Sequence, residues 1–122
     1  METLPTIEDE IRNLVKPFNM DNTIYIFHNP PANLDLDVTH AGLRVGSKAE
    51  YAFLKKNQPK LSLHGHIHES PYVSGKWFSQ LGNTICIQPG QSGQDDNSLI
   101  YALIDLETMN MERKMVKRDN KS

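Results

Sequence analysis

The sequence lacks the features that mark membrane, secreted or nucleic-acid-binding proteins. Its apolar runs fall far short of the roughly 20 residues that span a bilayer, and its first residues do not resemble a signal peptide, so we expect a cytoplasmic protein with no membrane partner. The single cysteine, Cys86, excludes an internal disulfide and, among β-branched neighbours, predicts a small buried side chain. Mixed charges that sum to −2 leave no basic stripe, so nucleic acid is not expected as a main partner.

The composition is that of one globular domain. Of the 122 residues, 38% are hydrophobic and 23% are charged, and we expect residues 1–122 to form a single domain with a flexible tail at 117–122. The apolar spacing after Thr6 predicts a helix over 7–16, and the capping pattern of Ser47 and Glu50 predicts a second helix that ends near Asn57.

Strands are expected on both sides of the second helix. The β-prone runs at 23–27 and 60–64 predict two parallel strands joined by a crossover, the first of them buried on both faces. Further short strands in an antiparallel meander are expected at 72–73, 76–78, 84–88, 99–106 and 111–117. The sequence therefore predicts an α/β fold with a mixed sheet and two helices.

Histidines gather at the ends of the two predicted parallel strands. His28 follows the first strand, and His66 and His68 belong to a His-Gly-His-Ile-His run that follows the second. Because the carboxyl ends of parallel strands meet at one edge of a sheet, we expect these imidazoles to converge on a divalent metal, with Gly65 supplying an unusual backbone angle. A lone histidine at a strand end is better explained as a surface or hydrogen-bonded residue, so this interpretation depends on the cluster.

Other polar residues near the cluster are candidates for supporting a ligand or contacting a substrate. These residues are His64, Glu69, Asn29, His40 and Arg44. His64 lies on the strand side of Gly65 and is expected to point into the fold. Glu69 could orient a ligand histidine or lie exposed.

Two loops are expected to border the site. The segment 29–46 is long for a small domain, which favours a functional role; within it His40 could contact substrate or cap a turn, and Arg44 could pair with phosphate or lie in solvent. The turn-rich segment 88–93 could bring backbone close to the histidines.

The motifs His28-Asn29-Pro30-Pro31 and Gly65-His66-Ile67-His68, with Gly46-Ser47 opening the helix between them, resemble the last two metal motifs of the calcineurin-like metallophosphoesterases. The resemblance runs from about residue 23 to residue 93 and implies half of a four-layer α/β/β/α sandwich. It also implies hydrolysis of phosphomonoesters or phosphodiesters at two divalent metals (Mn, Fe, Zn or Ni), with His28 and His66 on one metal and His68 on the other. The family's Asn-Pro-Gly turn is replaced here by Gln88-Pro89-Gly90.

The motifs of the family's first half are absent from this sequence. Asp-x-His, Gly-Asp-x-x-Asp and Gly-Asn-His do not occur, so the carboxylate that would bridge two metals has no matched position here. We therefore expect a carboxyl-terminal half with little activity alone, which forms a homo-oligomer or pairs with a chain that carries the missing half. The alternatives are a non-catalytic metal-binding or assembly module, and a binding domain whose histidines are structural.

Overall fold

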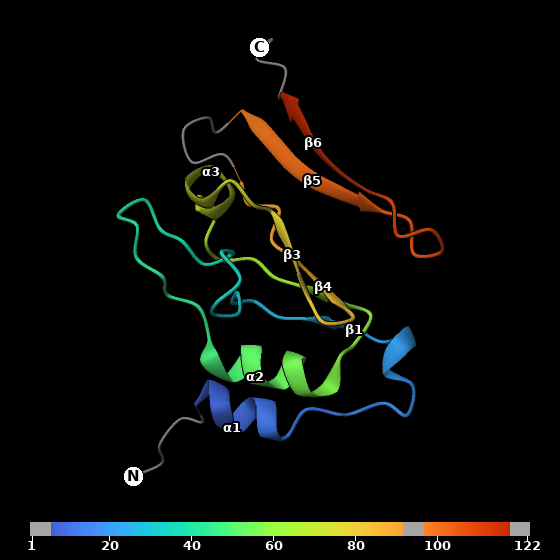
Figure 1. The fold of residues 1–122 in the computed structure, drawn as a ribbon. Helices are drawn as coiled ribbons and strands as arrows, with labels where there is room; N and C mark the ends of the chain where they lie inside the picture. Colours follow the sequence, from blue (N-terminus) through green and yellow to red (C-terminus); the bar gives the residue numbers. More distant parts are fainter. Residues whose placement is uncertain (1–5, 92–96, 118–122) are drawn as a thin grey trace.

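The centre of the fold is a mixed four-stranded sheet (Figure 1). The computed structural model describes residues 6–91 and 97–117. The strands are β1 (Ile24–Ile26), β2 (Leu61–Leu63), β3 (Phe78–Leu81) and β4 (Thr84–Ile87), in the order β1-β2-β4-β3. β1, β2 and β4 are parallel, and β3 runs antiparallel to β4. The α/β class with a mixed sheet and the parallel pair around the second helix are therefore confirmed.

Helices α1 (Ile7–Arg12) and α2 (Lys48–Asn57) lie side by side along one side of the sheet (Figure 1). Thr6 forms a capping box with Asp9 at the start of α1. The first helix ends at Arg12 and not at the predicted residue 16, and Asn13 takes its C-cap position. Val15, which the prediction placed on the apolar face of this helix, is 79% exposed and so does not pack against the core. No helix in residues 6–91 and 97–117 is long and apolar enough to cross a membrane.

A short third helix replaces one of the predicted strands. Residues 72–73 lie in α3 (Ser70–Ser74), so the strand expected there is wrong, and α3 adds a third helix to the two that were expected. Pro71 stands in the first turn of α3, where its missing N–H has no intrahelical partner to lose. Gly75 follows with a φ of 80°, the left-handed conformation that commonly ends a helix.

The core lies between the sheet and the two longer helices. Its buried members are Ile11, Leu36, Phe53, Leu54 and Cys86, so the prediction of a buried cysteine is confirmed. Tyr25 and Phe27 pack against Phe53 with ring centroids 5.0 Å and 6.3 Å away, both edge to face.

The prediction that the first strand is buried on both faces is wrong. β1 is an edge strand, and Ile24 and Ile26 on its second face are 38% and 79% exposed. The apolar run identifies a strand correctly, but it does not determine whether another layer covers the strand. Tyr25, which points the other way, packs in the core.

The last two strands form a separate hairpin instead of extending a meander. β5 (Ser98–Ile104) pairs only with β6 (Met111–Lys117) as a two-stranded antiparallel sheet, at the opposite end of the molecule from α1 and α2 (Figure 1). Arg113 Nε donates to the Pro89 carbonyl at 2.8 Å, and Lys60 Nζ donates to the Leu106 carbonyl at 2.6 Å. Lys117 closes β6, whereas residues 118–122 of the predicted flexible tail lie outside the described residues.

Candidate metal centre

The pairing of β1 with β2 continues beyond both strands and brings two distant histidines together. Phe27 N donates to the Leu63 carbonyl at 2.8 Å, and Gly65 N donates to the His28 carbonyl at 3.0 Å. These bonds hold His28 beside the turn that carries His66, at the carboxyl edge of the parallel strands, as the sequence predicts.

The rings of His28 and His66 face one another on the surface. His28 Nε2 lies 3.1 Å from His66 Nδ1, and the ring centroids are 4.8 Å apart. Both residues are exposed, so solvent and ligands can reach the pair. At 3.1 Å the two ring nitrogens are within hydrogen-bonding distance of each other. The same distance is close to the ~3.3 Å between two nitrogen ligands of one tetrahedral zinc ion, whose zinc–nitrogen bonds are ~2.0–2.1 Å long.

The unusual backbone angle in this turn is at His66, not at Gly65. His66 has a φ of 71°, the left-handed region that costs a non-glycine residue roughly 1–2 kcal/mol. Gly65 is absent from the positive-φ residues, so the role that the sequence suggested for it is wrong. Backbone strain of this kind persists where the surrounding contacts impose it, and it gathers at ligand sites.

His68 does not complete a ligand set with these two rings. It is exposed in the turn before α3, and its carbonyl accepts from Gln91 N at 2.9 Å. Within the described ranges, no group of three or more His, Cys, Asp or Glu side chains is arranged to hold a metal. The described residues therefore bring together two imidazoles, those of His28 and His66.

His64 points into the fold, as expected. Its side chain is fully buried and stacks on Phe27 with centroids 5.4 Å apart and planes 6° from parallel. Nδ1 lies 2.9 Å from the Asn29 carbonyl, so it carries the proton and donates, and Nε2 then accepts from Ser62 Oγ at 2.7 Å. The ring thus contacts the residues on both sides of His28 and fixes the backbone that presents it.

Glu50 lies beside this ring, and one of its two carboxyl oxygens has no hydrogen-bond partner among the described residues. Ser47 Oγ accepts from Glu50 N at 3.1 Å, but the Glu50 side chain turns into the protein instead of closing the capping box. Glu50 is 2% exposed, and its Oε1 has no hydrogen-bond partner in the described part of the chain although His64 Nδ1 is 3.4 Å away. Burial raises the pKa of Glu50, and the neighbouring His64 offsets part of that rise.

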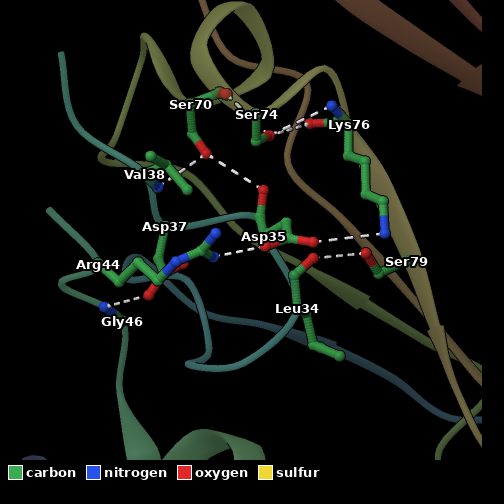
Figure 2. Close-up of polar contacts among 10 residues, drawn as sticks. All are labelled: Leu34, Asp35, Asp37, Val38, Arg44, Gly46, Ser70, Ser74, Lys76 and Ser79. Atoms are coloured by element: carbon green, nitrogen blue, oxygen red, sulfur yellow. Dashed lines mark hydrogen bonds and ion pairs between the residues drawn. The ribbon is translucent and has the colours of Figure 1, made fainter. Parts of the chain in front are cut away.

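The loop 29–46 is fastened to α3 and β3 by polar contacts (Figure 2). Asp35 pairs with Arg44 and lies 3.4 Å from Lys76 Nζ, and hydrogen bonding to Arg44, then to Lys76, lowers the pKa of Asp35. Ser70 Oγ accepts from Val38 N at 3.0 Å. Arg44 therefore has a carboxylate partner within its own loop.

The base of the same loop is closed by backbone contacts. Ser47 N donates to the Pro30 carbonyl and Ala32 N donates to the Ser47 carbonyl, both at 2.9 Å. Asp37, buried at 1% exposure, accepts from Gly46 N at 2.8 Å through Oδ2. Gly46 is required here because an added Cβ would meet the Pro31 carbonyl and the Asp37 carboxylate.

Two of the remaining candidates, Glu69 and His40, contact one another. Glu69 Oε2 accepts from His40 N at 3.3 Å, so its carboxylate holds the long loop in place. Hydrogen bonding to the backbone of Glu69 itself, and then to that of His40, holds the pKa of Glu69 below its ordinary value. The His40 ring is exposed, and Asn29 contributes its carbonyl to His64.

The segment 88–91 approaches the histidine turn, as predicted. The Gln88 side-chain amide donates to the Gly65 carbonyl, and Gly90 adopts a φ of 72° where a Cβ would come within 2.7 Å of the His68 carbonyl. Ser92 and Gly93, the end of the predicted segment, lie outside the described residues.

Sequence reasoning missed the buried polar groups beneath the site. Ser62 stands between two leucines on a short apolar strand, two residues before His64, and that interruption was the available signal. Glu50 was assigned to a helix cap, and nothing in its neighbours indicates that the carboxyl group turns inward.

Comparison with known proteins supports the fold and extends no further. No family model matches the sequence, and no curated protein matches it significantly. One solved crystal structure is similar with a TM-score of 0.60 and 25% identity, over 86% of this chain and 36% of the other. The crystal structure of TT1561 of Thermus thermophilus has a TM-score of 0.48 and 24% identity, over 76% of this chain and 34% of that one. The chain thus spans about a third of the proteins that it matches.

Proposed function

We propose that this chain is the metal-binding half of a calcineurin-like metallophosphoesterase, in which His28 and His66 hold one divalent metal at the site of phosphate ester hydrolysis. The proximity of these two exposed rings, 3.1 Å apart between ring nitrogens and 38 residues apart in sequence, carries the proposal. The left-handed backbone of His66 supports it, because strain is retained at sites that need a fixed geometry. The fold likeness at 25% identity is compatible with it.

A metal at this pair would polarise a phosphate oxygen and lower the pKa of bound water. The chain's own residues would do three things. His28 and His66 would supply nitrogen ligands, His64 would hold the backbone of His28 through the Asn29 carbonyl, and His68 would be available to a second metal. Carboxylate ligands would come from a second copy or from a chain that carries the missing half.

Metal analysis of untagged protein tests the proposal. We expect one equivalent of zinc, manganese, iron or nickel to bind, and His28→Ala or His66→Ala to lower the affinity at least tenfold, about 1.4 kcal/mol. The matched control is His40→Ala, which removes an exposed imidazole outside the His28–His66 pair and should leave the affinity unchanged.

Activity gives the second measurement. The chain alone should hydrolyse bis-p-nitrophenyl phosphate only slowly. Metal binding that persists in both His28→Ala and His66→Ala would contradict the proposal, as would a wild-type chain that binds no more metal than the double variant.

A non-catalytic assembly module is the second candidate, and exposed apolar side chains favour it. Ile26 on β1 is 79% exposed, and Leu99 and Leu103 on β5 are 60% and 54% exposed. Leu99 and Leu103, four residues apart on one strand, share a face of the hairpin with Val116, 49% exposed, which pairs with Leu99, and a continuous exposed apolar face marks an interaction site. Sedimentation equilibrium separates the candidates: a stable oligomer whose assembly and metal content are unchanged by His66→Ala would favour the module.

A further inference from the structure

β3 lies at the edge of the four-stranded sheet and borders a groove. It ends the strand order β1-β2-β4-β3, so within residues 6–91 and 97–117 it pairs with β4 alone. The groove has a volume of about 530 Å³ and is lined by residues 33–35 of the long loop and by residues 75–80; we call it the β3 groove. Figure 2 draws four of its lining residues, Leu34, Asp35, Lys76 and Ser79. A free strand edge and an adjoining space thus occur at the same place.

The pairing register determines which backbone groups of β3 point away from β4. Gln88 N donates to the Trp77 carbonyl at 2.8 Å, so these two residues form a hydrogen-bonded pair. Hydrogen-bonded and non-hydrogen-bonded pairs alternate along an antiparallel ladder, so Phe78 and Gln80 are in non-hydrogen-bonded pairs with β4. Their N–H and C=O groups therefore point to the free edge, where they bond to no other part of the described chain.

β3 has none of the features that usually protect a sheet edge. Its residues Phe78–Leu81 include no proline and no charged side chain, and its register with β4 contains no bulge. The loop beside it is fastened through a side chain, since Ser79 Oγ donates to the Leu34 carbonyl at 2.6 Å. The backbone of β3 is therefore left available, and extended peptides bind proteins by adding to such edges.

The charges at the β3 groove favour an acidic occupant. Among the described residues that line the groove, Asp35 alone is acidic, and it pairs with both Arg44 and Lys76. One carboxylate thus faces two cations, which leaves a net positive charge. The Lys76 side chain is 56% exposed, so a carboxylate from a ligand can reach it.

Apolar surface adjoins this charge. Leu34, Trp77 and Phe78 line the groove, and Phe78 is 43% exposed. The rings of Trp77 and Phe78 meet edge to face with centroids 4.9 Å apart. Side chains alternate in direction along a strand, so a segment that pairs with β3 places every second side chain on the same face of the sheet. A segment that combines apolar and acidic residues therefore matches the groove.

We propose that β3 binds an extended segment of a partner protein, which adds to the sheet as a fifth strand and carries apolar residues flanked by acidic ones. Hydrogen bonds to the backbones of Phe78 and Gln80 supply affinity, and Lys76 selects the acidic residue. A partner segment is favoured over a second copy of β3, because β3 has no acidic residue to place beside Lys76. The proposal does not depend on the phosphoesterase function, since neither His28 nor His66 lines the groove.

Amide hydrogen exchange of the full chain tests the pairing. The probe is the peptide acetyl-Glu-Val-Thr-Val-Glu-amide, and the matched control is the same peptide with every backbone N–H methylated. The probe should slow exchange at Phe78 and Gln80 at least about tenfold, because their N–H groups gain partners. Exchange at Ser79, whose N–H faces β4, should not change. Equal protection by the methylated peptide would overturn the proposal, as would no protection by the probe at its solubility limit.

Two pairs of variants test the edge and the charge separately, with a fluorescein-labelled probe and fluorescence anisotropy. Gln80→Pro removes an edge N–H without removing a hydrogen bond to β4, so it should lower the affinity at least about tenfold. Gln80→Ala loses the same side chain and should bind as the wild type does. Lys76→Glu should lower the affinity about fivefold and favour a peptide with lysines in place of the glutamates, whereas Lys48→Glu, outside the groove, should do neither. Unchanged affinity in both Gln80→Pro and Lys76→Glu would overturn the proposal.

Sedimentation velocity distinguishes a partner segment from a second copy. The wild-type chain and Gln80→Pro should have the same oligomeric state. Self-association that is present in the wild type and lost in Gln80→Pro would assign the edge to a second copy and overturn the proposal. Probe binding that persists in His66→Ala and in a chain that binds no metal would retain the proposal even if the phosphoesterase function were refuted.

Discussion

His64 and His66 are separated by one residue, yet their rings lie in opposite environments. His64 is buried, stacked on an aromatic ring and bonded through both nitrogens. His66 is exposed, has a left-handed backbone, and has the His28 ring as its neighbour. The difference separates two uses of one residue type: a satisfied buried imidazole specifies the fold, whereas an exposed and strained one is available to a ligand.

Removal of the buried His64 ring should give the largest change in the free energy of unfolding. His64→Ala leaves a cavity over Phe27 and removes the donor to the Asn29 carbonyl, so we expect a loss of roughly 2–4 kcal/mol in the free energy of unfolding. Urea denaturation measures it. His66→Ala is the control and should change stability by less than ~1 kcal/mol, since surface substitutions have small effects. Similar losses of unfolding free energy in both variants would show that the two rings do not differ in their contribution to stability.

A gentler change at the same position should affect metal binding more than folding. His64→Leu keeps apolar packing on Phe27 but no longer holds the Asn29 carbonyl, and loss of a group that supports a ligand typically lowers metal affinity about tenfold or more. Competition with a zinc chelator measures the affinity. His64→Asn, which can retain a donor, is the matched control. Unchanged affinity in His64→Leu would show that His64 does not position His28.

A glycine at position 66 should relieve the backbone strain of the left-handed conformation. His66→Gly accommodates the φ of 71° without the steric cost, so we expect a gain of about 1 kcal/mol in unfolding free energy together with loss of metal binding. Thermal unfolding measures the first effect and metal titration the second. A less stable His66→Gly chain would mean that the ring contributes more through its contacts than the backbone costs.

The pH dependence of stability that arises from Glu50 tests the buried polar groups around His64, with a smaller expected effect. Because burial raises its pKa above the ordinary 4.5, its contribution to stability is fully present below pH 4.5 and is lost as pH rises through the folded-state pKa. Glu50→Gln should therefore gain thermal stability relative to wild type as the pH increases from 4.5, and the gain should level off above the folded-state pKa. A difference that does not vary with pH would contradict the raised pKa.

The ion pair in the long loop should contribute least. Arg44 and Asp35 are 59% and 35% exposed at their side chains, and exposed pairs are worth at most about 1 kcal/mol. Arg44→Ala should lower the unfolding free energy by less than that in urea denaturation, and salt should reduce the difference further. A loss as large as that of His64→Ala would contradict the small contribution expected of this exposed ion pair.

The sequence was sufficient where local chemistry decides the structure. The side chain of Ser47 caps α2, and the crossover between two β-prone runs brings His28 to His66, as the strand-end argument predicts. The first result depends on a pattern within one short stretch of chain, and the second on two such stretches joined by a crossover of standard form. The metal itself, its identity and the role of His68 stay predictions.

The sequence was insufficient where a distant layer decides the outcome. Tyr25 and Ile26 belong to the same β-prone run, yet Tyr25 packs against the core and Ile26 is exposed, because burial depends on what covers each face of the sheet. Residues 72–73 have strand-forming side chains, but the flanking Pro71 and Gly75 and the packing of Ser70 make a helix turn. The left-handed angle falls at His66 although Gly65 beside it could adopt it at no cost.

Backbone hydrogen bonds close the base of the loop 29–46 beside His28. Because the Pro30 and Ser47 backbones are bonded to one another, residues added or lost between them need not displace His28 or the start of α2. Variation in that loop could therefore change which molecules reach the site while the imidazole pair stays in place. In the proposed phosphoesterase, the loop tip and the metal-binding residues would therefore be subject to separate structural constraints.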